Sequence, residues 1–314
     1  MRESKQACTD EPTTLVGMQN FNTDRMPISV VVPAFNEQAN IATQLEEIRS
    51  ILNLNRIEHE IIVVDDGSQD KTAEMAFDRC DNLVRHPENL GYGAALKAGI
   101  IASKFDTIII IDADGTYPSD VIPILLDKAR FYDMVVGARI LNQSHIPFIR
   151  KPAKWFLQNL ASYLAGRHIP DLNSGLRVMK KSVLERFFNI LPSGFSFTLT
   201  ITLSMLCNDY QVYYHPIEYY RRIGKSKLKA VESYNFLLLV LRTIVFFNPL
   251  KVFIPLGAIF FLLGFSKLVY DLFSFNVSES AVMGLLGSFM IWTLGIISDQ
   301  ISRIEMGTGI KRRK

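Results

Sequence analysis

Cysteine is scarce in this chain of 314 residues, which contains only Cys8, Cys80 and Cys207. Their number is odd and their spacing is not that of metal ligands. The sequence therefore argues against a disulfide framework and against a cysteine-bound metal. A reduced domain that faces the cytosol is the simplest interpretation.

A strong excess of charge of either sign is also missing. There are 34 Lys and Arg against 31 Asp and Glu, and the net charge of +3 is too small to indicate nucleic-acid binding. Residues 1–26 are polar and contain no apolar run, so we expect neither a signal peptide nor a leading membrane span there, but a disordered tail. The mean hydropathy of +0.16 is nevertheless high for a wholly soluble protein. The excess lies near the C-terminus.

From residue 28 onward, short apolar runs alternate with segments of helical apolar spacing. This alternation predicts βαβ units and a mostly parallel sheet. Residues 150–224 are less regular. The predicted strands are 28–32, 60–64, 83–84, 107–111, 134–137 and 212–220, and the predicted helices are 38–54, 71–79, 92–103, 119–131, 155–165, 180–188 and 197–207.

Three of the predicted strands end in polar or acidic residues. The strand 107–111, five β-branched residues in a row, precedes Asp112-Ala113-Asp114-Gly115, and the strand 60–64 precedes Asp65-Asp66. The first strand precedes Pro33-Ala34-Phe35-Asn36-Glu37, where we expect the proline to end sheet pairing.

Ligands of open α/β sheets bind beyond the carboxyl ends of the strands. Two carboxylates at positions i and i+2 there suit Mg²⁺ or Mn²⁺ held jointly with a diphosphate. Each motif alone is explained equally well by a capped turn or a solvated loop. Their agreement at one edge of one sheet favours a ligand site.

A glycine-rich loop, His86–Gly93, opens a predicted helix that contains Lys97. The third glycine of the dinucleotide-binding fingerprint is absent, and the chain has no Walker A motif. The loop is therefore predicted to be a turn.

Two long apolar segments lie near the C-terminus, Val252–Phe273 with 22 residues and Ala281–Ile297 with 17. About 20 residues span a bilayer. The alternative is a buried hairpin in a soluble core, but no other large apolar surface is left to bury it. The connection 274–280 has no Lys or Arg while both outer flanks are basic, so both termini are predicted to be cytoplasmic. Residues 230–247 predict an amphipathic helix that lies on the membrane or packs on the domain.

The motifs occur in an order typical of a known family: PAFNE, DDGSQD, HPENLGYGAALKAG, DADGTYP, GAR, DLNSGLR and RRIGKSK. Jointly they make residues 27–229 resemble glycosyltransferase family 2, and most closely its polyprenyl-phosphate sugar transferases, typified by dolichyl-phosphate mannose synthase. The resemblance implies an α/β GT-A fold, which is a Rossmann-like nucleotide-sugar domain, followed here by two C-terminal transmembrane helices.

The resulting organisation has five parts. They are a disordered tail (1–26), a GT-A domain (27–229), a juxtamembrane amphipathic helix (230–248), a two-helix membrane anchor (249–303) and a basic cytoplasmic tail (304–314).

The resemblance also implies a role for individual residues. The nucleotide-sugar would be bound by Pro33, Phe35, Glu37, Val64, Asp65, Asp66, Asp112, Ala113 and Asp114. Asp112 and Asp114 would bind Mg²⁺ or Mn²⁺. The family often has Gln two residues after the second Asp, and Thr116 stands there. Its shorter side chain leaves a third direct metal contact, or a water in its place, as alternatives.

Further residues are implied in catalysis and in binding the acceptor. The catalytic set is Asp114, Arg139, Asp171 and Arg177, and the set that would bind the acceptor phosphate is Ser174, Arg177, Arg222, Lys225 and Lys227. A basic stripe that attracts anionic lipid is a compatible reading of the cations. Asp171 is expected to orient the site or the sugar.

The implied reaction is an inverting transfer of a sugar from a UDP- or GDP-linked donor to polyprenyl phosphate at the cytoplasmic face of a membrane. The partners are the donor, the lipid acceptor and the bilayer, without nucleic acid, and a homo-oligomer stays open. One alternative is a family 2 enzyme that is processive or uses another acceptor, although the Gln-x-x-Arg-Trp motif of processive synthases is absent. Another is a non-catalytic scaffold that binds nucleotide-sugar or lipid phosphate, against which the intact acidic pair argues.

Overall fold

The computed structural model describes residues 26–140, 158–163, 165–194, 196–220, 245–246, 248–275 and 277–309. Several predictions lie wholly or partly outside these residues: the N-terminal tail, almost all of the amphipathic helix 230–247, the cations Arg222, Lys225 and Lys227, and parts of the predicted helix 155–165 and of the basic tail 304–314.

A seven-stranded sheet forms the centre of the domain, in the order β3-β2-β1-β4-β6-β5-β7. All neighbouring strands are parallel except β6, which runs antiparallel to both β4 and β5. The prediction of a mostly parallel sheet is thus confirmed. The strands are β1 (Ile28–Ala34), β2 (His59–Asp65), β3 (Asn82–Arg85), β4 (Thr107–Ile110), β5 (Met134–Arg139), β6 (Arg177–Lys180) and β7 (Val212–Ile217).

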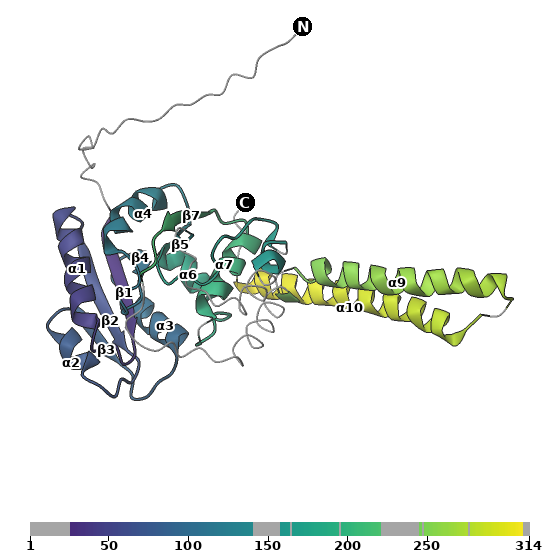
Figure 1. Cartoon of the computed structure of the whole chain (residues 1–314), viewed down its shortest axis with the longest axis horizontal. Helices are drawn as coiled ribbons and strands as arrows, with labels where there is room; N and C mark the ends of the chain where they lie inside the picture. Colours follow the sequence, from purple (N-terminus) through teal and green to yellow (C-terminus); the bar gives the residue numbers. More distant parts are fainter. Residues whose placement is uncertain are drawn as a thin grey trace, which may run out of the picture.

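Helices cover both faces of the sheet (Figure 1). Alternate residues of β4 supply the two cores, because successive side chains of a strand point to opposite faces. Ile109 packs in the core with helices α1 and α4, and Ile108 and Ile110 pack in the core with α3, α6 and α7. The helices are α1 (Ile41–Leu54), α2 (Thr72–Phe77), α3 (Tyr92–Ala102), α4 (Ile122–Ala129) after the 3₁₀ turn η1 (Ser119–Val121), α6 (Lys181–Phe187), α7 (Phe197–Cys207), α9 (Leu250–Phe273) and α10 (Glu279–Gly309).

Two sequence expectations about the strands were wrong. Strand β6 was not predicted, since its four residues begin and end with a charge. Pro33 does not end β1, which stays paired with β2 through Ala34. The carbonyl of Val31 faces β4 and that of Ala34 faces β2. Residues 31 and 33 have the same orientation in the strand, so the position where Pro33 lacks an N–H group faces β4. The last residue pair between β1 and β4 is Val31 with Ile110, so Pro33 lies beyond the paired region and no hydrogen bond between the strands is lost.

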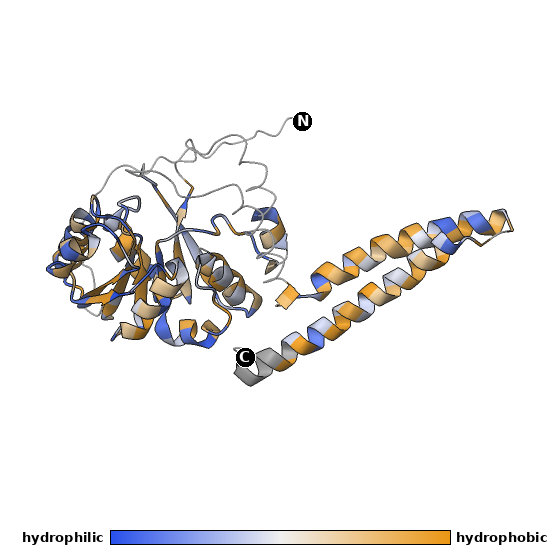
Figure 2. Ribbon diagram, turned by 90° about the horizontal axis from the view of Figure 1, so that it is seen from below, coloured by the Kyte–Doolittle hydropathy of each residue, from blue (hydrophilic) through white to orange (hydrophobic). Residues whose placement is uncertain are grey.

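The last two helices form an antiparallel hairpin that projects from the α/β domain (Figure 1). Both are long and apolar enough to cross a membrane. The 24 residues of α9 correspond to about 36 Å, more than the ~30 Å of a hydrocarbon core. The helices pack closely at Gly264 and Gly284, while apolar side chains such as Leu263 and Met283 are exposed on the outside. Figure 2 shows the apolar character along the hairpin. These helices are candidate membrane spans, and α10 continues past residue 303 to Gly309.

Candidate active site

The acidic segments predicted to meet do share one edge of the sheet. Strands β2, β1 and β4 are neighbours and parallel, so the residues that follow them lie beyond the same carboxyl edge. Pro33 and Val64 are buried within the strands themselves, whereas Phe35 and Glu37 are half-buried beyond β1. The loops after β1 and β2 are tied together by hydrogen bonds, among them from Asn36 N–H to Ser68 Oγ (2.9 Å).

Asp66 is used to hold a loop. Its side chain is 3% exposed and accepts hydrogen bonds from the backbone N–H groups of Leu90 (3.0 Å) and Gly91 (2.9 Å), and it pairs with His86 Nδ1 (2.7 Å). The glycine-rich loop, predicted to be a turn, therefore lies over the end of β2. Gly67, with φ +72°, permits this approach, because an added Cβ would lie 2.8 Å from the backbone nitrogen of Asn89.

Asp65 is equally enclosed. It is 1% exposed, accepts a hydrogen bond from Ser68 N–H (3.1 Å) and lies 3.5 Å from Arg85 Nε. Both carboxylates were expected to hold the base and ribose of a nucleotide. That stays a prediction; in the structure both carboxylates accept hydrogen bonds from the backbone of the adjoining loops.

Asp112 and Asp114 lie differently, since both are half-exposed. The Tyr92 hydroxyl donates to Asp112 Oδ1 (2.8 Å), and the Thr116 hydroxyl donates to Asp114 Oδ1 (2.6 Å). Burial and the neighbouring Asp112 raise the pKa of the Tyr92 phenol well above its ordinary value, so the phenol keeps its proton. Thr116 is fully buried and is used to orient Asp114, which favours the alternative without a direct Thr116 contact to a metal.

The donor chemistry of this pair fits a divalent cation shared with a diphosphate. Within the described ranges no group of three or more His, Cys, Asp or Glu could hold a metal. Asp112 and Asp114 are two hard oxygen ligands that the described residues could offer here, and phosphate oxygens and water would complete the octahedral set that Mg²⁺ demands.

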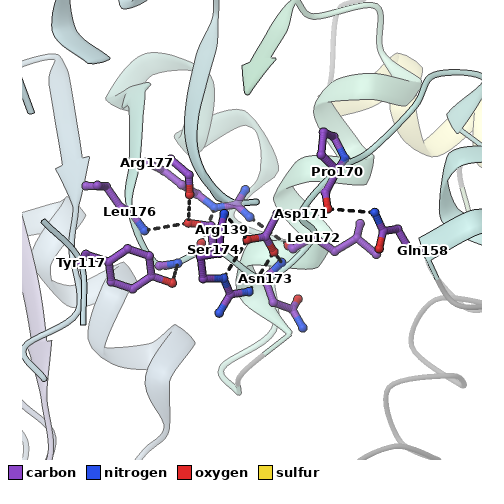
Figure 3. Close-up of polar contacts among 12 residues, drawn as sticks. Tyr117, Arg139, Gln158, Pro170, Asp171, Leu172, Asn173, Ser174, Leu176 and Arg177 are labelled. Carbon is purple, nitrogen blue, oxygen red and sulfur yellow. Dashed lines mark hydrogen bonds and ion pairs between the residues drawn. The ribbon is translucent and has the colours of Figure 1, made fainter. Parts of the chain in front are cut away.

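Arg139 and Asp171 form a buried two-point ion pair (Figure 3). The distances are 2.7 Å from Nε to Oδ2 and 2.8 Å from Nη2 to Oδ1, and Arg139 N–H also donates to Oδ2 (3.1 Å). Burial alone would raise the pKa of the Asp171 carboxyl, but the hydrogen bonds and charge of Arg139 outweigh it and lower that pKa. Asp171 is thus an ionised partner of Arg139 and a poor general base, while its role in orienting the site or the sugar stays a prediction.

Arg177 and Ser174, expected to bind the acceptor phosphate, point into the protein. Arg177 is fully buried and donates to the carbonyls of Ser174 (2.8 Å) and Leu172 (2.9 Å) and to Thr202 Oγ1 (2.6 Å). The Ser174 hydroxyl donates to the carbonyl of Gly137 (2.5 Å). These contacts fix the turn 171–177 between β5 and α7. Arg177 and Ser174 are therefore not placed for direct contact with an acceptor phosphate.

Three further residues join the site without having been singled out from the sequence. The Tyr117 hydroxyl accepts a hydrogen bond from Gly175 N–H (2.6 Å), and the Tyr117 ring packs edge-on against Tyr219, over which Arg139 lies at 5.2 Å. Tyr92, Tyr117 and Gly175 belong to the motifs LGYG, DADGTYP and DLNSGLR. The motifs therefore contain these residues. A single sequence does not reveal, however, that Tyr92 contacts Asp112, 20 residues away, or that Gly175 contacts Tyr117, 58 residues away.

Comparison with known families agrees with this geometry. Residues 29–188 match the Glycosyl transferase family 2 domain, and residues 248–304 match the GtrB C-terminal hairpin. The second match covers α9 and most of α10.

Two curated relatives illustrate the similarity. A dolichyl-phosphate hexose transferase of Haloferax volcanii is 30% identical over 203 residues, which are 64% of this chain and 86% of that protein. An undecaprenyl-phosphate 4-deoxy-4-formamido-L-arabinose transferase of Photorhabdus laumondii is 28% identical over 287 residues, covering 89% and 86%. The second alignment extends into the hairpin.

Solved structures share the GT-A fold. The glucosyl-3-phosphoglycerate synthase of Mycobacterium tuberculosis, in complex with Mn²⁺, UDP and glucosyl-3-phosphoglycerate, has a TM-score of 0.56 at 19% identity, over 70% of this chain and 79% of that one. The mannosyl-3-phosphoglycerate synthase of Rubrobacter xylanophilus has a TM-score of 0.57 at 17% identity, over 69% and 73%. At these identities the likeness is one of fold.

Proposed function

The chain belongs to glycosyl transferase family 2, and from that premise we propose that it transfers a sugar from a nucleotide diphosphate sugar to the phosphate of a polyprenol. One observation carries the proposal: a half-exposed carboxylate pair, Asp112 and Asp114, lies in the same chain as an apolar hairpin long enough to reach a lipid acceptor. The named relatives that act on dolichyl and undecaprenyl phosphates support it.

The donor would lie at the carboxyl edge of β1, β2 and β4. Asp112 and Asp114 would hold Mg²⁺ or Mn²⁺, which when bound neutralises charge on the leaving diphosphate. Phe35 and Glu37 would line the nucleotide pocket, and Asp65 and Asp66 would act through the loops that they hold. UDP and GDP are both compatible with these groups.

The acceptor phosphate is an anion at neutral pH, so its attack needs no strong general base. Asp171, already paired with Arg139, would keep that guanidinium in place beside the site. Arg222, Lys225 and Lys227 would hold the acceptor phosphate, since cations suit a phosphate at a membrane surface. A single in-line attack would invert the configuration at the anomeric carbon.

Membrane attachment follows from the acceptor, whose polyprenyl tail stays in the bilayer. The two helices would span the membrane, with the catalytic domain and both termini on the cytoplasmic side. The segment 230–248 would set the height of the site above the lipid.

A donor screen on the full chain in detergent tests this function. Radiolabelled UDP-glucose, UDP-galactose, UDP-N-acetylglucosamine and GDP-mannose are each offered with undecaprenyl phosphate and Mn²⁺ or Mg²⁺. We expect label from one donor to enter the organic phase and EDTA to prevent it. Undecaprenol without phosphate is the matched control.

Phosphoglyceric acid, bound in a structural neighbour, serves as a water-soluble acceptor. Transfer to it and not to the lipid would overturn the lipid assignment. Donor binding without any transfer would favour the scaffold alternative.

A further inference from the structure

The carboxyl group of Asp112 is contacted from two sides by residues far apart in the sequence. Tyr92, in the first turn of α3, donates its hydroxyl to Oδ1 at 2.8 Å. Gly175, just before β6, faces the same carboxyl group so closely that a methyl group there would overlap it, with the added Cβ 2.6 Å from Oδ1. The three atoms nearest to that methyl group all belong to Asp112.

The Tyr92 side of this arrangement is anchored through the start of α3. Ala94 N–H donates to the carbonyl of Ser193 (2.9 Å), and Lys97 Nζ donates to the carbonyl of Leu191. The Tyr92 ring packs against the core shared by α3, α6 and α7. The hydroxyl is therefore presented to Asp112 from a fixed helix end.

The Gly175 side is anchored through the turn 171–177, whose neighbouring contacts are drawn in Figure 3. Gly175 N–H donates to the Tyr117 hydroxyl (2.6 Å), and Ser174 and Arg177 hold the turn on either side. Since nothing larger than a hydrogen atom fits at residue 175, this wall limits how far the Asp112 carboxyl group can rotate.

We propose that Tyr92 is a positioning residue for the metal-binding carboxylate Asp112, and that Gly175 provides the space that this orientation needs. An aspartate has two side-chain torsions, and the Tyr92 hydroxyl on one oxygen and the close backbone of Gly175 together favour one orientation. In that orientation Asp112 would be held ready to bind a divalent cation together with Asp114. This inference rests on the proposed function, because it assigns Tyr92 a role toward the metal of the donor complex.

Mn²⁺ titration of Tyr92→Phe in the full chain, in detergent, tests the inference. Free Mn²⁺ is counted by its EPR signal with UDP and with GDP present, and donor KM is measured separately at saturating Mn²⁺. We expect the half-saturating Mn²⁺ concentration to rise about 10-fold, as is usual when an outer partner of a metal ligand is lost. The donor KM at saturating Mn²⁺ should change far less.

Tyr210→Phe is the matched control, because it also removes one phenol hydroxyl in a buried position away from this edge, one that accepts a hydrogen bond from Arg186 Nη1 (3.2 Å). Its Mn²⁺ affinity should equal that of the wild type. Equal affinity of Tyr92→Phe and wild type would overturn the inference and leave the proposed function intact. Absence of Mn²⁺ binding by the wild type with either nucleotide would instead overturn the metal site itself, and the inference with it.

Gly175→Ala tests the Gly175 side of the arrangement independently, and it provides a second test if Tyr92→Phe does not fold. Its methyl group should displace the Asp112 carboxyl group and weaken Mn²⁺ binding. Gly194→Ala is its control, since among the described residues, its chain neighbours aside, no heavy atom lies within 4 Å of a methyl group added there. Unchanged Mn²⁺ affinity in Gly175→Ala would contradict the two-sided arrangement.

Discussion

Two acidic pairs follow two strands of the same sheet, and the structure uses them in opposite ways. Asp65 and Asp66 are 1% and 3% exposed and accept hydrogen bonds from nearby loops, whereas Asp112 and Asp114 are half-exposed and are oriented by hydroxyl groups. The loop 86–91 contributes to this difference, because its residues His86, Leu90 and Gly91 bind the Asp66 carboxylate. An acidic strand end can thus hold a loop, as Asp66 does, or stay only partly buried, as Asp112 and Asp114 do.

The largest expected effect is on catalysis, in the half-exposed pair. Asp114→Asn keeps the hydrogen bond from Thr116 but removes the charge that would hold the cation. Transfer should fall by about two to three orders of magnitude, the range for losing one preorganised electrostatic group. The melting temperature, measured in parallel, should stay near that of the wild type. Normal turnover would remove the metal assignment.

Substitution in the buried pair, Asp65 and Asp66, should instead lower the stability of the fold. Asp66→Ala leaves the N–H groups of Leu90 and Gly91 without their acceptor, and the free energy of unfolding should fall by about 3 kcal/mol. Limited proteolysis should cut the loop 86–91 sooner. Asp78→Ala, at an exposed position, is the control for loss of a charge alone. A variant as stable as the wild type would show that Asp66 does not hold the loop.

Asp171 is a third, buried carboxylate, and its pH dependence distinguishes an ion-pair role from a ligand role. Its folded-state pKa is lowered, so its contribution to stability is fully present above the unfolded value of about 3.9 and is lost as pH falls through the folded value. Wild type should exceed Asp171→Asn by on the order of 2 kcal/mol at neutral pH. The gap, measured by urea unfolding, should shrink below pH 4. A constant gap would rule out this linkage.

The smallest effect concerns the space beside Asp112. Gly175→Ala should destabilise the fold by roughly 1 kcal/mol through overlap with the Asp112 carboxyl group. In an Asp112→Ala background most of that cost should vanish, because the three nearest atoms are gone. Additive losses in the double variant would place the strain elsewhere.

Much of the fold was predictable because strong local patterns agreed with the tertiary structure. The run Thr107–Ile111 is almost all β4, and the helical spacing over 197–207 coincides with α7. The three strands that precede polar or acidic residues were expected to share one edge of one sheet, and they are neighbours in it. Family 2 membership and the apolar C-terminal helices agree with the motifs and the hydropathy.

What the sequence could not show is which polar groups the tertiary structure encloses. Arg177 carries the guanidinium group expected of a phosphate ligand. In the structure this group is buried in the domain and donates hydrogen bonds to two backbone carbonyls and to Thr202. Strand β6 was also missed, because it has only four residues and begins with Arg177, a charged residue that the tertiary structure buries. The use of Asp66 depended on a loop that returns from 20 residues further along the chain.

The most direct test of the central claim compares transfer of labelled sugar into lipid by wild type, Asp66→Ala and Asp114→Asn, each normalised to folded protein, with and without EDTA. The account predicts transfer by the wild type that EDTA abolishes, a partial loss in Asp66→Ala, and almost none in Asp114→Asn. Transfer by Asp114→Asn at the wild-type rate, or transfer that EDTA leaves unchanged, would contradict the assignment of the half-exposed pair as the metal and donor site.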